Sequence, residues 1–191
     1  MSKGAQLFPD NQTVTDYSYK GFQSINPENI KEIKKARYLN LAGNNMIDLP
    51  LKLTKLEGLS LAYNNIELLS LSMVERFQSY PKLKYLDLSH NSLSTFNDNL
   101  SKLKGLERLF LSGNQLNSVK LSNRKLSVLD LSSNLFRSYP EMLPSSLSIL
   151  NLASNSIKSI SPITSNIVEL RLQMNELTSI SEGAYFPNLK V

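Results

Sequence analysis

The chain repeats one spacing of apolar and polar positions, L-x-x-L-x-L-x-x-N-x-L, seven times between residues 36 and 177. Apolar residues separated by one other residue lie on the same side of an extended backbone, so each L-x-L predicts a short strand with one buried face. The repeat asparagines follow one another at intervals of 20, 27, 23, 20, 21 and 20 residues. Periodicity in this range predicts a solenoid in which each repeat forms one coil.

The asparagine of each repeat is predicted to lie in a buried ladder that runs along the solenoid. An asparagine amide both donates and accepts hydrogen bonds, so it can satisfy backbone groups where the chain leaves a strand. With one asparagine per coil, stacking of the coils aligns the amides in a column. The predicted ladder consists of Asn44, Asn64, Asn91, Asn114, Asn134, Asn155 and Asn175.

The repeated motif resembles that of the leucine-rich repeat family from Ala36 to Val191, and 35 leucines with 20 asparagines fit this resemblance. One coil cannot bury its own leucine face, so stability has to come from the stacking of neighbours. The resemblance implies an α/β repeat solenoid, a right-handed leucine-rich repeat superhelix with a parallel concave β-sheet. Loops, extended segments and short helices are expected on the convex side.

Two regions are predicted along the chain. Residues 1–35 are interpreted as an N-terminal cap with a short helix, and residues 36–191 as an array of seven repeats. A truncated eighth repeat is predicted to start at Leu189, and no capping element follows it. We therefore expect either a fragment or a covering neighbour, with more repeats or a catalytic domain C-terminal to Val191 as one possibility.

The N-terminal cap is predicted to hold one atypical strand and one helix. Val14, Tyr17 and Tyr19 follow the strand spacing of the repeats without the asparagine. Residues 26–28 then combine an N-cap asparagine, a proline and an acidic residue, which is typical of a helix start. Ile33 gives this helix an apolar side.

The lengths of the repeats predict what covers the convex side. The 27-residue interval holds residues 72–77, which read as a helix that ends near Pro81. The 20-residue intervals are too short for a full helix. There, Pro140, Pro144 and Pro162 favour extended or turn backbone.

Three columns of side chains alternate with the core leucines and are predicted to face the concave side. The third column is small almost throughout, which the curvature of the sheet explains without any ligand. The first column holds Tyr38, Gly58, Tyr85, Arg108, Val128, Ile149 and Glu169, and the second holds Asn40, Ser60, Asp87, Phe110, Asp130, Asn151 and Arg171.

Apolar residues of the first two columns are predicted to lie near one another on a solvent face, with charged residues around them. An exposed apolar patch with a charged rim is typical of a protein-binding surface. The alternative is cross-strand packing and ion pairing with no partner. The candidate partner-binding residues are Tyr38, Tyr85, Asp87, Arg108, Phe110, Val128, Asp130, Ile149, Asn151, Glu169 and Arg171.

The composition argues against catalytic and metal chemistry. The chain has no cysteine and one histidine, so it offers no disulfide framework, no thiol nucleophile and no Cys-based zinc site. Asp87, Ser89 and His90 share neither an oxyanion donor nor a pocket, so they do not predict a catalytic triad. No cofactor, no metal and no enzymatic activity are expected.

Charge and hydropathy limit the remaining partners. The net charge of +5 is mild, and the basic residues between Lys31 and Arg37 lack the interleaved aromatics of a nucleic-acid reader. No apolar run approaches the roughly 18 residues of a membrane helix, and the N-terminus is not a signal peptide. We therefore expect a cytoplasmic protein that binds neither nucleic acid nor membranes.

These observations favour an intracellular protein–protein interaction module that binds a partner on its concave face. One alternative is the regulatory arm of a larger signalling enzyme, such as a phosphatase, cyclase, kinase or ubiquitin ligase. Another is an extracellular receptor arm, which is motivated by the sequons at Asn11 and Asn99 and disfavoured by the absence of cysteine.

Overall fold

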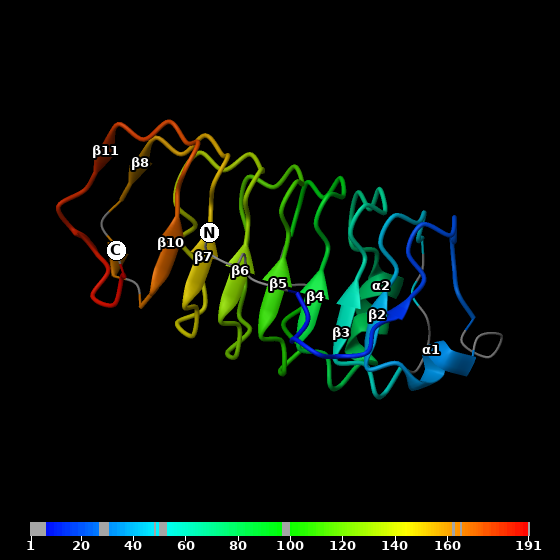
Figure 1. Cartoon of the computed structure of the whole chain (residues 1–191). Helices are drawn as coiled ribbons and strands as arrows, with labels where there is room; N and C mark the ends of the chain where they lie inside the picture. Colours follow the sequence, from blue (N-terminus) through cyan, green and yellow to red (C-terminus); the bar gives the residue numbers. More distant parts are fainter. Residues whose placement is uncertain are drawn as a thin grey trace.

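The computed structural model describes residues 7–26, 31–47, 49, 53–96, 100–161, 163–164 and 166–190 of the chain. Parallel strands stack side by side along a curved solenoid, with one strand from each repeat (Figure 1). The eight-stranded sheet has the order β1 (Thr15–Asp16), β2 (Tyr38–Asn40), β3 (Gly58–Ser60), β4 (Tyr85–Asp87), β5 (Arg108–Phe110), β6 (Val128–Asp130), β7 (Ile149–Asn151) and β10 (Glu169–Arg171). The predicted solenoid with a parallel sheet is confirmed.

The core is one continuous apolar cluster behind the sheet, and the repeat leucines form most of it. The middle residue of a strand pairs with the middle residue of the next strand, as Leu86 does with Leu109, and both are completely buried. The apolar residue that follows each asparagine turns back into the same core, and Leu93, Leu116 and Ile157 are also completely buried. The alternation along L-x-L therefore decides which side of each strand faces inward.

The repeat asparagines link neighbouring coils through their side-chain amides. Asn91 Nδ2 donates to the carbonyl oxygens of Leu61 and Leu88, both at 3.0 Å, and Asn91 Oδ1 accepts from the Ile66 N–H at 2.9 Å. The other six asparagines also donate to a carbonyl of their own coil and to one of the preceding coil. Each amide thus satisfies backbone groups that the tight turn after the strand leaves unpaired.

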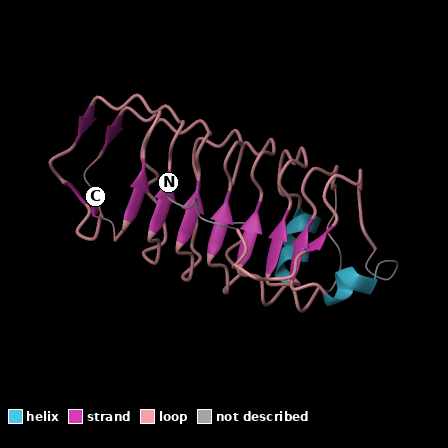
Figure 2. Cartoon of the chain, viewed as in Figure 1, coloured by secondary structure: helices cyan, strands magenta, loops and turns pink. Residues whose placement is uncertain are grey.

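Two helices occur in the described residues, and Figure 2 shows both at the N-terminal end of the array. Helix α2 (Leu71–Gln78) fills the 27-residue interval as predicted, and the Ser70 side chain caps it by accepting from the Met73 N–H. Helix α1 (Lys31–Lys35) buries Ile33 against the first coils. The predicted start of α1 at Pro27 lies outside the described residues.

Extended segments on the convex side of the last coils pair with each other, which was not predicted. Strand β8 (Ser159–Ile160) pairs with β11 (Ser179–Ile180), and β9 (Ile163–Thr164) pairs with β12 (Ala184–Tyr185), both in parallel. Ser159 lies opposite Ser179, an offset of 20 residues that equals the interval from Asn155 to Asn175, whereas Ile163 lies opposite Ala184, an offset of 21 residues. Pro162, which was expected to favour extended backbone here, lies outside the described residues.

The N-terminal strand forms, but its predicted register is wrong by two residues. Thr15 lies opposite Leu39, so Tyr17 takes the place of the second core leucine of a repeat. In agreement, Asn44 Nδ2 donates to the carbonyl oxygen of Tyr17. Tyr19 lies outside the core and is 72% exposed. The register follows from Asp16, whose Oδ1 accepts from the Ser18 N–H and thereby ends the strand as second-column residues do in later repeats.

Candidate functional site

The concave face consists of the first and third residues of each sheet strand, which alternate with the buried middle residue. Figure 1 shows helix α2 behind the sheet, on the side opposite this face. They form the first and second columns predicted from the repeat spacing. Because the strands are hydrogen-bonded in register, residues of one column are direct neighbours from coil to coil.

Several second-column residues have a structural role at the strand exit that the sequence did not reveal. Asp130 Oδ1 accepts from the backbone N–H and the hydroxyl of Ser132, and Asp130 Oδ2 accepts from Asn151 Nδ2 at 3.1 Å. Asp87 Oδ1 accepts in the same way from the Ser89 N–H, and Asn151 Oδ1 accepts from the Ala153 N–H. These side chains are therefore held in fixed positions before any partner arrives.

Apolar concave-face residues of β4, β5 and β6 are more buried than predicted. Tyr85, Phe110 and Val128 are only 9%, 9% and 7% exposed, so their predicted placement on a solvent face is wrong. Neighbouring side chains cover them across the strands, since the guanidinium of Arg108 lies 5.4 Å above the centre of the Tyr85 ring. Tyr38 is 4% exposed, and the ring of Phe8 packs on it at 5.4 Å.

The C-terminal half of the concave face remains partly open. Its half-buried side chains combine one large apolar residue with amide and charged groups. Glu169 and Arg171 of β10 pair with each other, with Arg171 Nε 2.7 Å from Glu169 Oε1. We call this surface the open concave patch, and it consists of Arg108, Asp130, Ile149, Asn151, Glu169 and Arg171.

A row of alternating charges borders the strand starts beside the first column. Arg37 pairs with Glu57 at 2.8 Å between Nη2 and Oε1, and Lys84 Nζ lies 3.8 Å from the other oxygen of Glu57. Exposed pairs of this kind contribute little to stability. They place positive and negative side chains alternately along one edge of the concave face.

We expect Tyr38 and Tyr85 to ionise at higher pH than an exposed tyrosine. Burial raises the pKa of both phenols, and the carboxylates of Glu57 and Glu107 raise it further. A folded pKa above the unfolded value of about 10 means that the contribution to stability is complete below about pH 10 and is lost as the pH rises through the folded pKa.

An alkaline titration of tyrosinate absorbance tests this expectation. Replacing both buried tyrosines by phenylalanine should remove the part of the tyrosinate titration that occurs at the highest pH. Loss of an early part in the double variant would show that these phenols are accessible.

The residue before each repeat asparagine adopts a left-handed backbone conformation, which the motif did not predict. Tyr63, His90, Ser133 and Met174 all have φ between 53° and 57°. The ring of His90 stacks on that of Tyr63, with centroids 4.3 Å apart and planes 7° apart. This row forms the rim of the concave face at the strand exits.

Within the ranges described, no cluster of three or more His, Asp or Glu side chains could hold a metal ion. No helix among these residues is long and apolar enough to cross a membrane.

The family description "Leucine rich repeat" matches residues 74–116 of the chain. Oligodendrocyte-myelin glycoprotein of Homo sapiens is 32% identical over 92% of this chain, lumican of Gallus gallus is 31% identical over 88%, and Toll-like receptor 2 of Equus caballus is 26% identical over 84%. The chain spans only 36%, 44% and 19% of these proteins respectively. Their names denote a glycoprotein and a receptor, and none denotes an enzyme.

Solved structures of similar fold include a leucine-rich repeat protein of Leptospira interrogans. It has a TM-score of 0.62 and 25% identity, and the match covers 92% of this chain and 52% of that one. The LRIM1/APL1C complex matches with a TM-score of 0.61 and 22% identity, over 86% of this chain and 36% of that one. These matches agree with the fold derived above.

Proposed function

The chain is a leucine-rich repeat protein, and we propose that it binds a partner protein on the concave face of its sheet without being an enzyme itself. The observation that carries the proposal is the open concave patch. Its side chains vary in chemistry from strand to strand, whereas the core positions behind them repeat. Surfaces that combine an apolar centre with arginine and amide groups suit protein recognition.

The rigidity of the patch supports binding with a small entropic cost. Asp130 and Asn151 are held by hydrogen bonds to the strand exits, and Arg171 is held by Glu169. A receptor whose side chains are already ordered loses less conformational freedom when a partner binds. One solved structure of similar fold is itself that of a complex, LRIM1/APL1C.

A pair of matched variants tests the proposal. Ile149→Arg with Glu169→Lys adds bulk and positive charge to half-buried positions of the patch that lie outside the asparagine ladder. Ser138→Arg with Glu141→Lys makes the same change of charge at exposed positions of the loop between β6 and β7. Far-UV circular dichroism and urea unfolding check that both variants keep the fold.

The measurement is the amount of each protein retained from an extract of the source cells by the immobilised chain. We expect a partner that the wild-type chain and the loop variant retain and that the patch variant loses by about tenfold or more, the factor that corresponds to 1.4 kcal/mol. Equal retention by the patch variant, or loss only in the loop variant, would contradict binding at the patch.

The cellular location of the protein stays a prediction. The absence of cysteine favours the cytoplasm. The functional alternative from the sequence is that the repeat array is the regulatory arm of a larger signalling enzyme. A second candidate is an extracellular receptor arm, favoured by relatives that are named as a receptor and a glycoprotein. Asn11 of the first sequon is exposed, whereas Asn99 lies outside the described residues. A mass decrease of the natural protein on deglycosylation would support the extracellular candidate, and an unglycosylated cytosolic pool would support the cytoplasmic one.

A further inference from the structure

A glycine interrupts the first concave column at a place where space, rather than backbone conformation, requires it. Gly58 is the first residue of β3 and lies between Tyr38 of β2 and Tyr85 of β4. Its φ is not in the left-handed region, so other residues could adopt the same backbone. A Cβ at this position would lie 2.6 Å from Cε1 of Phe8 and 2.8 Å from Cδ1 of Tyr38. The missing side chain therefore leaves room for the ring of Phe8.

Three aromatic rings meet above Gly58. The rings of Tyr38 and Tyr85 lean toward each other, with centroids 6.2 Å apart, and the Phe8 ring lies 5.4 Å from that of Tyr38. A guanidinium flanks the cluster at each end, with Arg37 over Tyr38 and Arg108 over Tyr85. We call the space above Gly58 and beside the ring of Tyr38, which the Phe8 ring fills, the aromatic notch.

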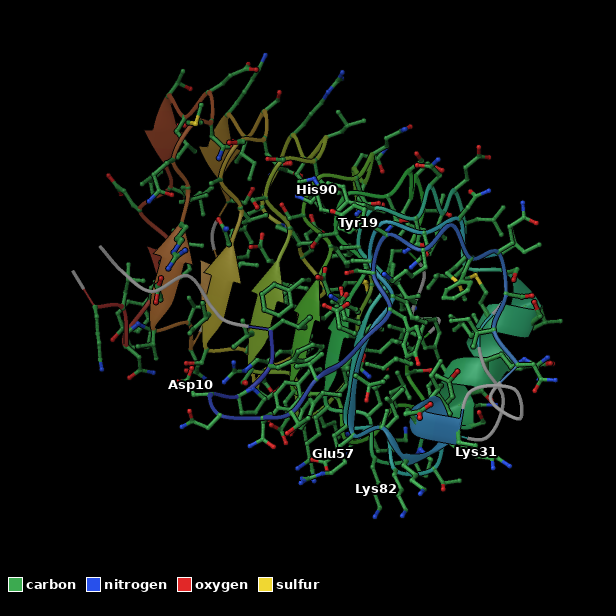
Figure 3. All side chains as sticks on the ribbon, turned by 45° about the vertical axis from the view of Figure 1, so that its right-hand side comes forward. Asp10, Tyr19, Lys31, Glu57, Lys82 and His90 are labelled. Carbon is green, nitrogen blue, oxygen red and sulfur yellow. The ribbon has the colours of Figure 1, made fainter. Side chains whose placement is uncertain are left out.

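The segment that carries Phe8 lies across the concave face and then returns to β1. In Figure 1 it crosses in front of the sheet, and Figure 3 shows Asp10 on the side away from the helices. Leu7, Phe8 and Pro9 are half-buried, whereas residues 10–13 are exposed. Among the described contacts, residues 7–13 make no hydrogen bond with the sheet. Apolar contact therefore dominates how this segment is held.

We propose that the aromatic notch is a receptor site for a Phe or Tyr side chain on an extended segment of the partner protein, and that Phe8 is its tethered occupant. The inference rests on the proposed function, because it assigns the notch to the same concave face. Six residues separate Phe8 from Thr15 of β1, and a tether this short gives an effective concentration in the millimolar range. A partner has to displace Phe8 before it can use the notch.

The occupant is tested first, without any partner. The chain has no tryptophan, so Phe8→Trp introduces a single fluorescent reporter. We expect emission at short wavelength and weak quenching by acrylamide. Adding Gly58→Ala should move the emission to longer wavelength and strengthen the quenching, whereas Gly105→Ala should not, because a Cβ there meets only the Leu83 carbonyl oxygen at 3.4 Å. An indole that is fully quenchable whatever residue occupies position 58 would overturn the proposal.

A reporter closer in size to phenylalanine tests the same contact in case the larger indole does not fit the notch. With 4-fluorophenylalanine at position 8, the 19F resonance should change with Gly58→Ala and stay unchanged with Gly105→Ala. Urea unfolding of each variant establishes that the coils remain folded. A resonance that is indifferent to Gly58→Ala in a folded chain would also overturn the proposal.

The receptor role is tested with a synthetic peptide of residues 5–13 as the probe, added to the full chain and followed by amide shifts in 1H–15N NMR spectra. The peptide should shift the Gly58 amide of the Phe8→Ala chain and bind wild type about tenfold more weakly, the order expected from docking one aromatic ring. The same peptide with Phe8→Ala, or a chain that also carries Gly58→Ala, should show no such shift. Equal binding to wild type and to Phe8→Ala, or no shift at Gly58, would contradict the notch as a receptor.

Failure of this inference can be told apart from failure of the proposed function. The fluorescence, 19F and peptide experiments report on β2 to β4 and involve no partner. Partner capture with the Ile149 and Glu169 substitutions reports on β7 and β10. If the indole at position 8 is protected from quenching but the wild-type chain retains no partner, the proposed function is wrong. If the indole is fully quenched but partner capture is normal, only the aromatic notch is wrong.

Discussion

Asn91→Ala is expected to lower the free energy of unfolding by about 3–4 kcal/mol, because the amide oxygen of Asn91 is the acceptor for two buried backbone N–H groups. Its Oδ1 accepts from the N–H groups of Asn64 and Ile66, and its Nδ2 donates to the carbonyl oxygens of Leu61, Leu88 and Ser89. Alanine leaves these two N–H groups without a partner, whereas the three carbonyl oxygens keep their bonds to Asn64 Nδ2, Asn114 Nδ2 and the Tyr63 N–H. Each buried group left without a partner costs about 1–3 kcal/mol, although the local structure relaxes in part.

Urea unfolding followed by circular dichroism measures the effect of Asn91→Ala. Asn117→Ala serves as the matched control, because Asn117 is exposed and lies outside the ladder. Its effect should stay within about 0.5 kcal/mol. A cost for Asn91→Ala as small as that of the control would show that the ladder does not hold the coils together.

Phe77→Ala is expected to destabilise the chain by about 3–5 kcal/mol, the usual cost of deleting a buried aromatic ring. Phe77 lies on α2, is completely buried and packs edge-on against Tyr80, with centroids 6.4 Å apart. The interior of the long coil would have to collapse around the vacated volume, and helix α2 is anchored only through Met73 and Phe77 among its fully buried residues.

Leu71→Ala on the same helix is the control for the Phe77 substitution. Leu71 is 76% exposed, so its truncation removes little buried surface. Both variants are compared by urea unfolding at one temperature. Similar midpoints for the two variants would contradict the placement of α2 against the core.

The repeat spacing carried most of the fold because it is local and repeated seven times. Each L-x-L determines a strand and each asparagine a turn, and stacking neighbours of the same kind leaves little freedom in topology. The helix in the 27-residue interval was predictable for the same reason, since the extra residues had no other place in the coil. The pairing of β8 with β11 was missed because the convex segments carry no repeated pattern of their own.

The N-terminal region shows where the pattern fails. The spacing of Val14, Tyr17 and Tyr19 matched the motif by apolar type alone, whereas Asp16 decides the register through its hydrogen bond to the Ser18 N–H. Short polar side chains that end strands are visible in the sequence at Asp87 and Asp130 as well. Comparing the second column across repeats would have aligned Asp16 with Asn40.

The candidate site was predictable in position but not in exposure. Spacing placed the columns on the concave face, yet the burial of Tyr38 depends on Phe8, which lies 30 residues away in sequence and belongs to no repeat. The only signal was Gly58, a residue without a side chain in a column of large ones. Such a gap indicates that something from outside the column fills the space.

Hydroxyl-radical footprinting of the chain, alone and bound to the first partner that it retains, tests the central claim most directly because it reports the exposure of each side chain. Binding on the concave face predicts that oxidation of Ile149 and Arg171 falls in the complex. Oxidation of Met142 and Leu71, which are 55% and 76% exposed outside the concave face, should stay unchanged. The account would be contradicted if oxidation of Met142 or Leu71 fell in the complex while Ile149 stayed as reactive as in the free chain.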